Sequence, residues 1–279
     1  MKNFSDEFIV VDEYKTRYWI YGDAQETVLL LHGFALAIEI WELNIQSIGK
    51  NYKVLALDLP GFGLTDKLKG SFHLDYYPQF LLKFLQALNI LKVHIVGHSM
   101  GGLIATRFTQ LFPAIVKSLV LVSSVGFKSH IPPHFRIFSL PFLGEIFVKP
   151  NQQGLQSALR KNTFYKIPYT KYLAEKLYEY SLHPEMPKTL LQVARSAIGI
   201  FGFKRVIIKA IRSDINKLTM PVMIIWGKND AIIYANHALD AHKLIKNSKL
   251  VLFEKCGHLP QLEYPERFNA QVEDFLRHS

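Results

Sequence analysis

The sequence predicts an α/β protein organised around a mostly parallel sheet, and three observations support this class. Short apolar runs alternate with amphipathic stretches through the first third of the chain, which is the pattern of strands interleaved with helices. Strand-like runs return near the C-terminus, after a long helical and basic middle. Apolar residues make up 49% of the 279 residues, so the chain can bury a large core.

Strands are expected where a short apolar run is rich in β-branched residues and ends near Gly, Pro or Asp. Residues 8–11 and 17–21 have the texture of an opening hairpin. The other expected strands span residues 28–31, 54–57, 93–96, 119–122, 222–225 and 250–253. Because amphipathic stretches lie between many of these runs, we expect them to form the centre of a mostly parallel sheet.

Helices are expected where apolar residues recur at helical spacing, and these helices would cover the faces of the sheet. The expected helices span residues 41–48, 77–88, 103–112 and 265–276. In the second of them Phe80, Phe84 and Leu88 fall on one face. Pro113 ends the third, because proline cannot continue a helix.

Residues 128–217 interrupt the alternation with a helical and basic texture. Seven prolines divide this segment into short elements, and we expect no strand in it. It holds 15 basic and 5 acidic residues, a net charge of +10, whereas the rest of the chain holds 18 of each. We therefore expect one α/β core, residues 1–127 and 218–279, with residues 128–217 inserted as a helical cap.

Composition also argues against several classes of protein. The single cysteine, Cys256, cannot form an internal disulfide, which argues against a cross-linked secreted scaffold. The first residues lack the order of a signal peptide, and no apolar run reaches the roughly 18 residues of a membrane span. We therefore expect a soluble, cytoplasmic protein without a membrane span.

The charge of the insert raises the question of an anionic partner. The sequence holds no recognisable nucleic-acid-binding motif, so we expect no nucleic-acid partner. It also holds no zinc-type Cys/His spacing, phosphate-binding Gly-rich loop or dinucleotide fingerprint, so we expect no metal and no cofactor. The oligomeric state stays open between a monomer and a homodimer.

The segment that carries the chemistry is a strand that runs into Gly-His-Ser-Met-Gly at positions 97–101 and then into a helix. A sharp turn of this kind holds the serine in a strained conformation, and small neighbours let the helix approach the strand. Gly97 and Gly101 meet that need. We therefore expect Ser99 to be a nucleophile.

A serine nucleophile needs a base, and the base needs a carboxylate that fixes its tautomer. In this architecture the chain order is Ser, then Asp or Glu, then His, each after a strand. Asp230 and His258 each follow a late strand by a few residues, so we expect them to complete a triad. Asp58 and Glu254 lack the expected positions and are interpreted as structural.

Two backbone donors are expected to form an oxyanion hole. Met100 follows the nucleophile, and Phe34 lies in an earlier loop where Gly33 allows a tight turn. His32 is expected to orient this loop by hydrogen bonding rather than to act as a second base. The residues expected at the substrate site are His32, Gly33, Trp41, His98 and Arg195.

These motifs together resemble the α/β-hydrolase fold superfamily. They lie in order at positions 32–34, 58–63, 97–102, 226–230 and 257–258, and the resemblance covers about residues 1–127 and 218–279. It implies a mainly parallel eight-stranded sheet flanked by helices, with a helical cap inserted after the sixth strand. The resemblance also disfavours dehalogenases and epoxide hydrolases, which use aspartate where this chain has Ser99.

Within this superfamily we expect a carboxylic-ester hydrolase of the carboxylesterase or lipase type, acting through an acyl-enzyme. A carbon–carbon bond hydrolase of the meta-cleavage-product type is the alternative, because it shares the triad, the Gly-Phe-Gly loop and a helical cap. Those enzymes often carry an aromatic residue after the catalytic histidine, where this chain has Leu259. A slow or non-catalytic protein that binds a small molecule is a further alternative.

Two features of the insert remain open. In carbon–carbon hydrolases a cap arginine binds the substrate carboxylate, a role that Arg195 can fill unless it simply faces solvent. Residues 137–144 and 198–203 are apolar, and they can line an acyl pocket or pack the cap against the core. With the charge of the insert they can also make a weak contact with an anionic lipid surface, although a solvated lysine-rich surface explains the charge as well.

Overall fold

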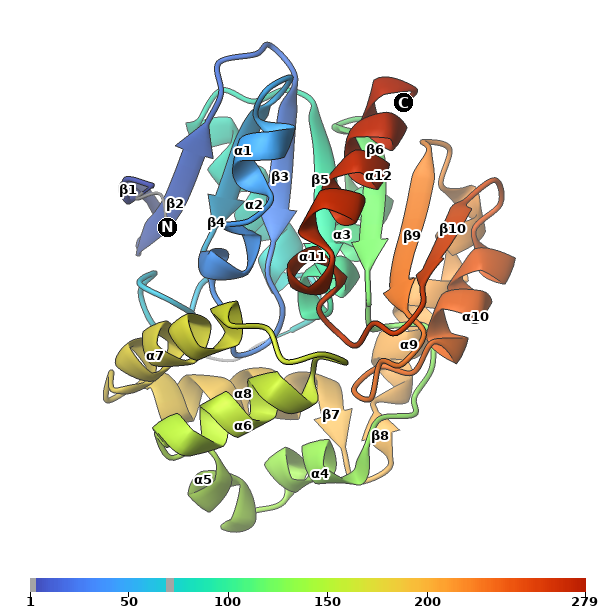
Figure 1. The fold of residues 1–279 in the computed structure, drawn as a ribbon. Coiled ribbons are helices and arrows are strands. Elements are labelled where there is room, and N and C mark those ends of the chain that lie inside the picture. The colour runs from blue at the N-terminus through green and yellow to red at the C-terminus, as the bar shows by residue number, and fades with distance from the viewer. Residues whose placement is uncertain (1–3, 69–72) are drawn as a thin grey trace.

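The computed structural model describes residues 4–68 and 73–279, and it has the α/β architecture expected from the sequence (Figure 1). An eight-stranded sheet runs in the order β1-β2-β4-β3-β5-β6-β9-β10. β1 is antiparallel to β2, and β2 is antiparallel to β4, whereas the other neighbouring pairs are parallel. The strands are β1 (Glu7–Val11), β2 (Tyr14–Tyr21), β3 (Thr27–Leu31), β4 (Lys53–Leu57), β5 (Val93–His98), β6 (Val116–Val122), β9 (Val222–Gly227) and β10 (Lys249–Phe253).

All eight expected strands are confirmed, each lying within one of these strands. The central strands were easy to predict because both faces of the parallel sheet are covered, which makes their sequences continuously apolar. Every residue of β3 and of β5 is buried. Alternate residues of β3 enter two separate cores: Leu29 and Leu31 pack on one face, and Val28 and Leu30 pack on the other.

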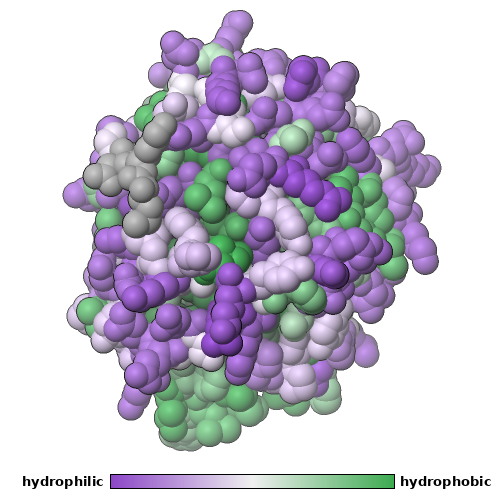
Figure 2. Space-filling model, viewed as in Figure 1, coloured by the Kyte–Doolittle hydropathy of each residue, from purple (hydrophilic) through white to green (hydrophobic). Residues whose placement is uncertain are grey.

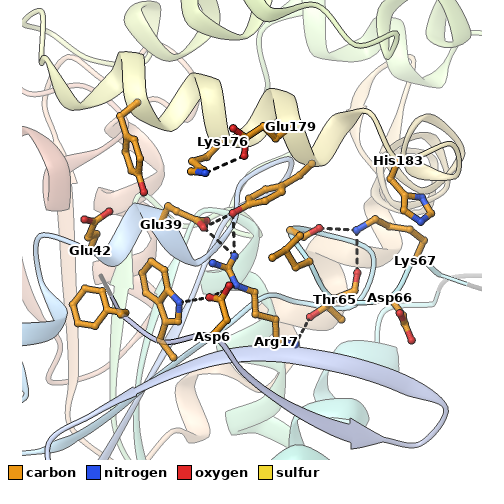
Figure 3. Close-up of a pocket in the computed structure, with 16 residues that line it drawn as sticks. Asp6, Arg17, Glu39, Glu42, Thr65, Asp66, Lys67, Lys176, Glu179 and His183 are labelled. Carbon is orange, nitrogen blue, oxygen red and sulfur yellow. Dashed lines mark hydrogen bonds and ion pairs between the residues drawn. The ribbon is translucent and has the colours of Figure 1, made fainter. Parts of the chain in front are cut away.

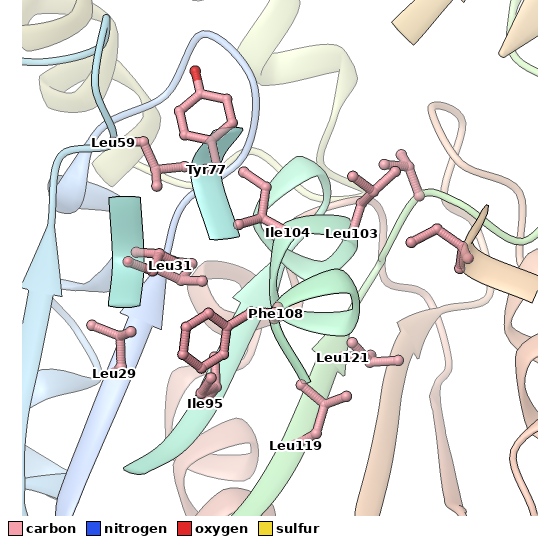
Figure 4. Packing of buried hydrophobic residues seen from close by; sticks show 14 of the residues in the cluster. Leu29, Leu31, Leu59, Tyr77, Ile95, Leu103, Ile104, Phe108, Leu119 and Leu121 are labelled. Carbon is pink, nitrogen blue, oxygen red and sulfur yellow. The ribbon is translucent and has the colours of Figure 1, made fainter. Parts of the chain in front are cut away.

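Helices cover both faces of the sheet. Helices α2 (Tyr76–Ala87), α3 (Met100–Leu111) and α10 (Asn236–Leu244) pack on one face, and α1 (Ile45–Ile48) and α12 (Pro265–Arg277) pack on the other. Figure 4 shows Ile104 and Phe108 of α3 against Leu31 and Ile95 of the strands. This packing holds the start of α3 directly at the end of β5, where Ser99 lies.

One expected helix is wrong in detail. Instead of one helix over residues 41–48, the chain forms a 3₁₀ turn η1 (Ile38–Trp41) and the short α1. The break occurs at Asn44, whose side-chain nitrogen donates to the carbonyl of Gln261 at 3.0 Å and to Asn269 at 2.8 Å. These long-range partners override the local helical pattern.

The segment between β6 and β9 lies at the carboxyl ends of the parallel strands (Figure 1). Its elements are α4 (Pro133–Arg136), η2 (Ile137–Ser139), α5 (Leu143–Phe147), α6 (Gln152–Lys161), α7 (Tyr169–Ser181), α8 (Met186–Ala197), α9 (Arg205–Ser213) and η3 (Ile215–Lys217). It also contains β7 (Ile198–Gly199) antiparallel to β8 (Gly202–Phe203), which corrects the expectation of no strand here. Strands of two residues are too short to show an alternating pattern.

Within the described residues, no helix has the length and apolar character needed to cross a membrane.

Candidate active site

Ser99 is the single residue between β5 and α3. Its backbone has φ of +54° and ψ of −114°, a conformation that residues other than glycine rarely adopt. Hydrogen bonds fix this conformation. The N–H of Ser99 donates to the carbonyl of Val122 at 2.9 Å, and its carbonyl accepts from Gly102 at 3.0 Å and Val125 at 3.2 Å. The turn therefore has the geometry of a nucleophile elbow.

The glycines of the motif are required by close backbone contacts. A Cβ atom on Gly97 would lie 2.5 Å from the carbonyl oxygen of Gly101, and one on Gly101 would lie 2.4 Å from the carbonyl oxygen of Leu31. Neither contact is possible without moving backbone. The two glycines allow α3 to start immediately above the sheet, as the sequence pattern predicts.

Asp230 and His258 form a buried pair at the same edge of the sheet. Oδ2 of Asp230 lies 2.7 Å from Nδ1 of His258. The other carboxylate oxygen, Oδ1, accepts from the N–H groups of Ile232 and Ile233, each at 2.8 Å. An ionised carboxylate only accepts, so Nδ1 of His258 carries the proton and Nε2 is left as the basic nitrogen.

The loop that carries His258 is held beside the elbow. Nε2 of His98 donates to the carbonyl of His258 at 2.9 Å, and the centres of the two rings are 4.8 Å apart. Burial lowers the pKa of His98 well below its usual value, so its ring is neutral at pH 7. His98 therefore positions the backbone of His258, and its side chain is completely buried.

Ser99 retains 9% exposure, and His258 is almost completely buried. Within residues 4–68 and 73–279, neither the Ser99 hydroxyl nor Nε2 of His258 has a hydrogen-bond partner. Both atoms therefore keep their capacity to bond to a third group. Catalytic hydrogen bonds commonly tighten only when substrate is present.

The loop after β3 lies against the elbow, as the position of Gly33 indicates. A Cβ atom on Gly33 would lie 3.0 Å from the Cβ of Ser99 and 2.9 Å from Nδ1 of His98. The N–H groups of Phe34 and Met100 have no acceptor within the part of the chain that the structure describes. Both donors are therefore free.

His32 orients this loop. Its Nε2 accepts from the N–H of Leu59 at 2.9 Å, and its Nδ1 donates to the carbonyl of Gly33 at 2.8 Å. Burial lowers the pKa of His32 to about 4, so the ring is neutral at pH 7. The side chain is completely buried, and both of its ring nitrogens are engaged in these contacts.

Two other residues expected at the substrate site have structural contacts. Trp41 is completely buried, with its ring centre 6.2 Å from that of Phe268. Arg195 donates from Nε to the carbonyl of Phe138 at 3.0 Å and pairs through Nη2 with Glu145 at 2.9 Å. The guanidinium of Arg195 therefore ties α8 to η2 and α5 rather than pointing to an open site.

The carboxylates interpreted as structural have structural contacts. Asp58 is completely buried and accepts from the N–H groups of Ile38 and Leu64 and from Arg17. Glu254 pairs with Lys228 on the surface. Within residues 4–68 and 73–279, neither carboxylate forms a hydrogen bond with a histidine.

A cavity of about 660 Å³ lies to the side of this site, between β2, the loop after β4 and α7. Figure 3 shows Arg17 at its centre with Asp6 and Glu39, and Lys176 and Glu179 on α7. A smaller, apolar cavity of about 40 Å³ adjoins it and is lined by two residues of the loop after Phe34 and by side chains of the insert. Phe62 and Gly63 of the loop after β4 also line it, and the full lining is Ala35, Leu36, Phe62, Gly63, Leu155, Leu177, Tyr180, Ser181, Met186 and Leu190.

Sequence reasoning missed two groups that support the His258 loop. The carbonyl of Asn162 accepts from the N–H of His258 at 2.7 Å. The carboxylate of Glu263 accepts from the N–H of Gly257 and from that of Phe164, both at 2.7 Å. No local pattern marks Asn162 or Phe164, because they approach the loop only through the fold of the insert.

Comparison with known proteins shows the family to which the chain belongs. The family model for the alpha/beta hydrolase fold matches residues 26–265, and the chain belongs to this family. Membership of the family supports a hydrolase.

The similar proteins include hydrolases of different kinds. The chain is 28% identical to a 2-hydroxy-6-oxononadienedioate/2-hydroxy-6-oxononatrienedioate hydrolase of Pseudomonas putida, over 92% of this chain and 90% of the relative. It is 25% identical to the solved meta-cleavage product hydrolase from Pseudomonas fluorescens, with a TM-score of 0.83 over 98% of this chain and 97% of that one. A carboxylesterase from Bacillus subtilis shares the fold, with a TM-score of 0.82 at 18% identity over 100% of this chain and 93% of that one.

Proposed function

We propose that this chain hydrolyses carboxylic esters, with Ser99 as nucleophile, His258 as general base and acid, and Asp230 as its supporting carboxylate. One observation carries the proposal. A strained serine turn and a buried Asp–His pair meet at the carboxyl edge of one sheet, with the basic nitrogen of His258 left without a partner among the described residues.

In the proposed reaction, Nε2 of His258 takes the hydroxyl proton of Ser99 while Oγ attacks the ester carbonyl carbon. The N–H groups of Phe34 and Met100 stabilise the oxyanion of the tetrahedral intermediate. The imidazolium of His258 then protonates the departing alkoxide, which leaves an acyl-enzyme on Ser99. A water molecule, deprotonated by the same nitrogen, attacks the acyl carbon, and the imidazolium returns this proton to Oγ of Ser99 as the acid is released.

The surroundings of the proposed oxyanion loop favour an apolar acyl group. Ala35 and Leu36 follow the loop and line the apolar cavity. The ring of Phe34 also packs on Phe138 of η2, with ring centres 5.7 Å apart. We propose that the segment 128–217 acts as a cap whose apolar side chains complete this pocket.

Carbon–carbon bond hydrolysis is the second candidate, because the relatives named above include enzymes that act on meta-cleavage products. Such substrates carry a carboxylate that needs a cationic partner. Arg195 is already paired with Glu145 and two carbonyl groups. Its engagement favours the ester reaction.

Turnover of two substrate series tests these alternatives. We would compare wild type, Ser99→Ala and the control Ser213→Ala on p-nitrophenyl esters of increasing acyl length and on a vinylogous keto acid. The ester reaction predicts turnover of the esters by wild type and the control, with about a 10⁴-fold or greater loss in Ser99→Ala.

Other outcomes distinguish the alternatives. Cleavage of the keto acid with negligible ester turnover would replace the proposal with the carbon–carbon reaction, and Arg195→Ala would then be the next variant. No turnover of either series would favour the further alternative, a binding protein.

A further inference from the structure

The insert exposes a group of large apolar side chains at the end of the molecule farthest from the sheet. We call this group the apolar tip; it comprises Phe142, Leu143, Ile146 and Phe147 at α5, and Ile200 and Phe201 in the turn between β7 and β8. Phe142 is 83% exposed and Phe201 is 85% exposed. Figure 2 shows an apolar surface at the lower end of the molecule, where Figure 1 places α5.

The two parts of the apolar tip belong to one packed unit. η2 contacts both α5 and β7, and α4 contacts η2 and both strands of the hairpin. Single exposed apolar residues are common on protein surfaces, but a gathered group of aromatic and aliphatic side chains marks an interaction surface.

Charge around the apolar tip indicates the chemistry of its partner. Lys149 follows α5, and Lys204 and Arg205 follow β8 directly. These three exposed cations have no carboxylate partner among the described residues. Glu145, the acidic residue on α5, is neutralised by Arg195 at 2.9 Å.

Apolar side chains rimmed by free cations match the interface of an anionic lipid bilayer, where the rings enter the acyl region and the cations meet the headgroups. A second copy of this chain matches less well. Two inserts, each with a net charge of +10, would meet with like charges opposed.

Ring contacts connect the apolar tip to the loop beside Ser99. The ring centre of Phe147 lies 5.8 Å from that of Phe138, which in turn lies 5.7 Å from that of Phe34. The apolar tip and the loop after β3 are therefore connected by a series of aromatic ring contacts.

We propose that the apolar tip docks this protein on anionic lipid surfaces, with Phe142 and Phe201 inserted and Lys149, Lys204 and Arg205 at the headgroups. This docking does not rest on the proposed function, because it is a property of the surface of the insert.

Co-sedimentation of the full chain with lipid vesicles tests the docking. We would compare vesicles of phosphatidylcholine alone with mixed phosphatidylcholine and phosphatidylglycerol vesicles, at low and high salt. We expect wild type to sediment with the mixed vesicles and to be released by salt. The double variant F142S/F201S and the double variant K204A/R205A should each lose about tenfold in partitioning.

A matched control separates docking from general surface apolarity. Leu91 is 84% exposed and precedes β5, at the amino end of the strands and away from the insert. L91S should partition as wild type does. Thermal unfolding of each variant, together with its turnover of a soluble p-nitrophenyl ester, reports whether the fold and the Ser99 site are intact, so failure of docking is distinguished from failure of the proposed function.

Three outcomes would overturn the docking proposal. The first is wild type that does not sediment with the mixed vesicles. The second is equal partitioning of L91S and F142S/F201S, whether lowered or unchanged. The third is a dimer, seen by sedimentation equilibrium, that F142S/F201S converts to monomer while vesicle binding is unaffected, because the apolar tip would then bind a second copy of the chain.

Discussion

The carboxylate of Asp230 is fixed by three hydrogen bonds, one to His258 and two to backbone N–H groups. The two backbone bonds set which oxygen faces the imidazole. The carboxylate therefore selects the tautomer of His258 that leaves Nε2 basic. Removing its charge while keeping its shape tests this role.

We predict that Asp230→Asn lowers kcat about 10⁴-fold, because the amide nitrogen donates to Nδ1 and reverses the tautomer of His258. The amide oxygen can still accept from Ile232 and Ile233, so the melting temperature should change little. Steady-state kinetics on the best p-nitrophenyl ester measure the effect. Glu254→Gln, at an exposed carboxylate paired with Lys228, is the control. A loss of less than tenfold would contradict the assignment of Asp230.

At the scale of elements, the His258 loop is stabilised from two sides. Glu263 of α11 (Pro260–Glu263) bonds the N–H groups of Gly257 and Phe164, one from the loop and one from the insert. Asn162 bonds the N–H of His258 directly. The insert therefore helps to position the proposed catalytic histidine, and it does so through its backbone.

We predict that Glu263→Gln lowers kcat about tenfold, because the amide can accept at one position only and leaves one N–H without its partner. KM and the melting temperature should change much less than kcat. The matched control is Glu266→Gln, an exposed residue at the start of α12. Equal kinetics of the two variants would show that Glu263 does not position His258.

The elements differ in how well the sequence predicts them, and the reason is the range of their contacts. The eight strands and the turn at Ser99 follow from local apolar runs and glycine spacing. The break at Asn44 depends on Gln261 and Asn269, more than two hundred positions away. The local sequence pattern around Asn44 contains no information about such distant partners.

The candidate site divides in the same way. The positions of Ser99, Asp230 and His258 relative to the strands were predictable from chain order. The complete burial of Trp41 and His98 was not predictable, because it depends on neighbours that only the fold supplies. The exposure of Phe142 and Phe201 could not be predicted either, because an apolar stretch has the same sequence whether it is buried or exposed to solvent.

At the scale of the whole molecule, buried histidines link stability to pH. Burial lowers the pKa of His237 and of His32 to about 4, against about 6.5 in an unfolded chain. Between these values the unfolded state binds more protons, so each histidine destabilises the fold as pH falls from 6.5 towards 4. Carboxyl groups whose pKa burial raises, such as Glu263, act in the opposite direction over part of the same range.

We predict that His237→Leu makes the free energy of unfolding less dependent on pH between about 6.5 and 4. The variant lacks one side chain that takes up a proton when the chain unfolds in this pH range. Neither ring nitrogen of His237 has a hydrogen-bond partner among residues 4–68 and 73–279, so leucine loses no bond to them. Urea unfolding at several pH values measures the slope. His278→Gln, at an exposed position, should leave the slope as in wild type. An unchanged slope in His237→Leu would contradict the buried, neutral state of this ring.

We propose that Ser99 is a nucleophile activated by His258 and Asp230. Labelling with a fluorophosphonate, followed by peptide mapping, tests it most directly, because the reagent forms a stable adduct with an activated serine. We expect one adduct, on the peptide that contains Ser99; it should be absent from Ser99→Ala and form much more slowly in His258→Ala. An adduct on another serine, or ester turnover that persists in Ser99→Ala, would contradict it.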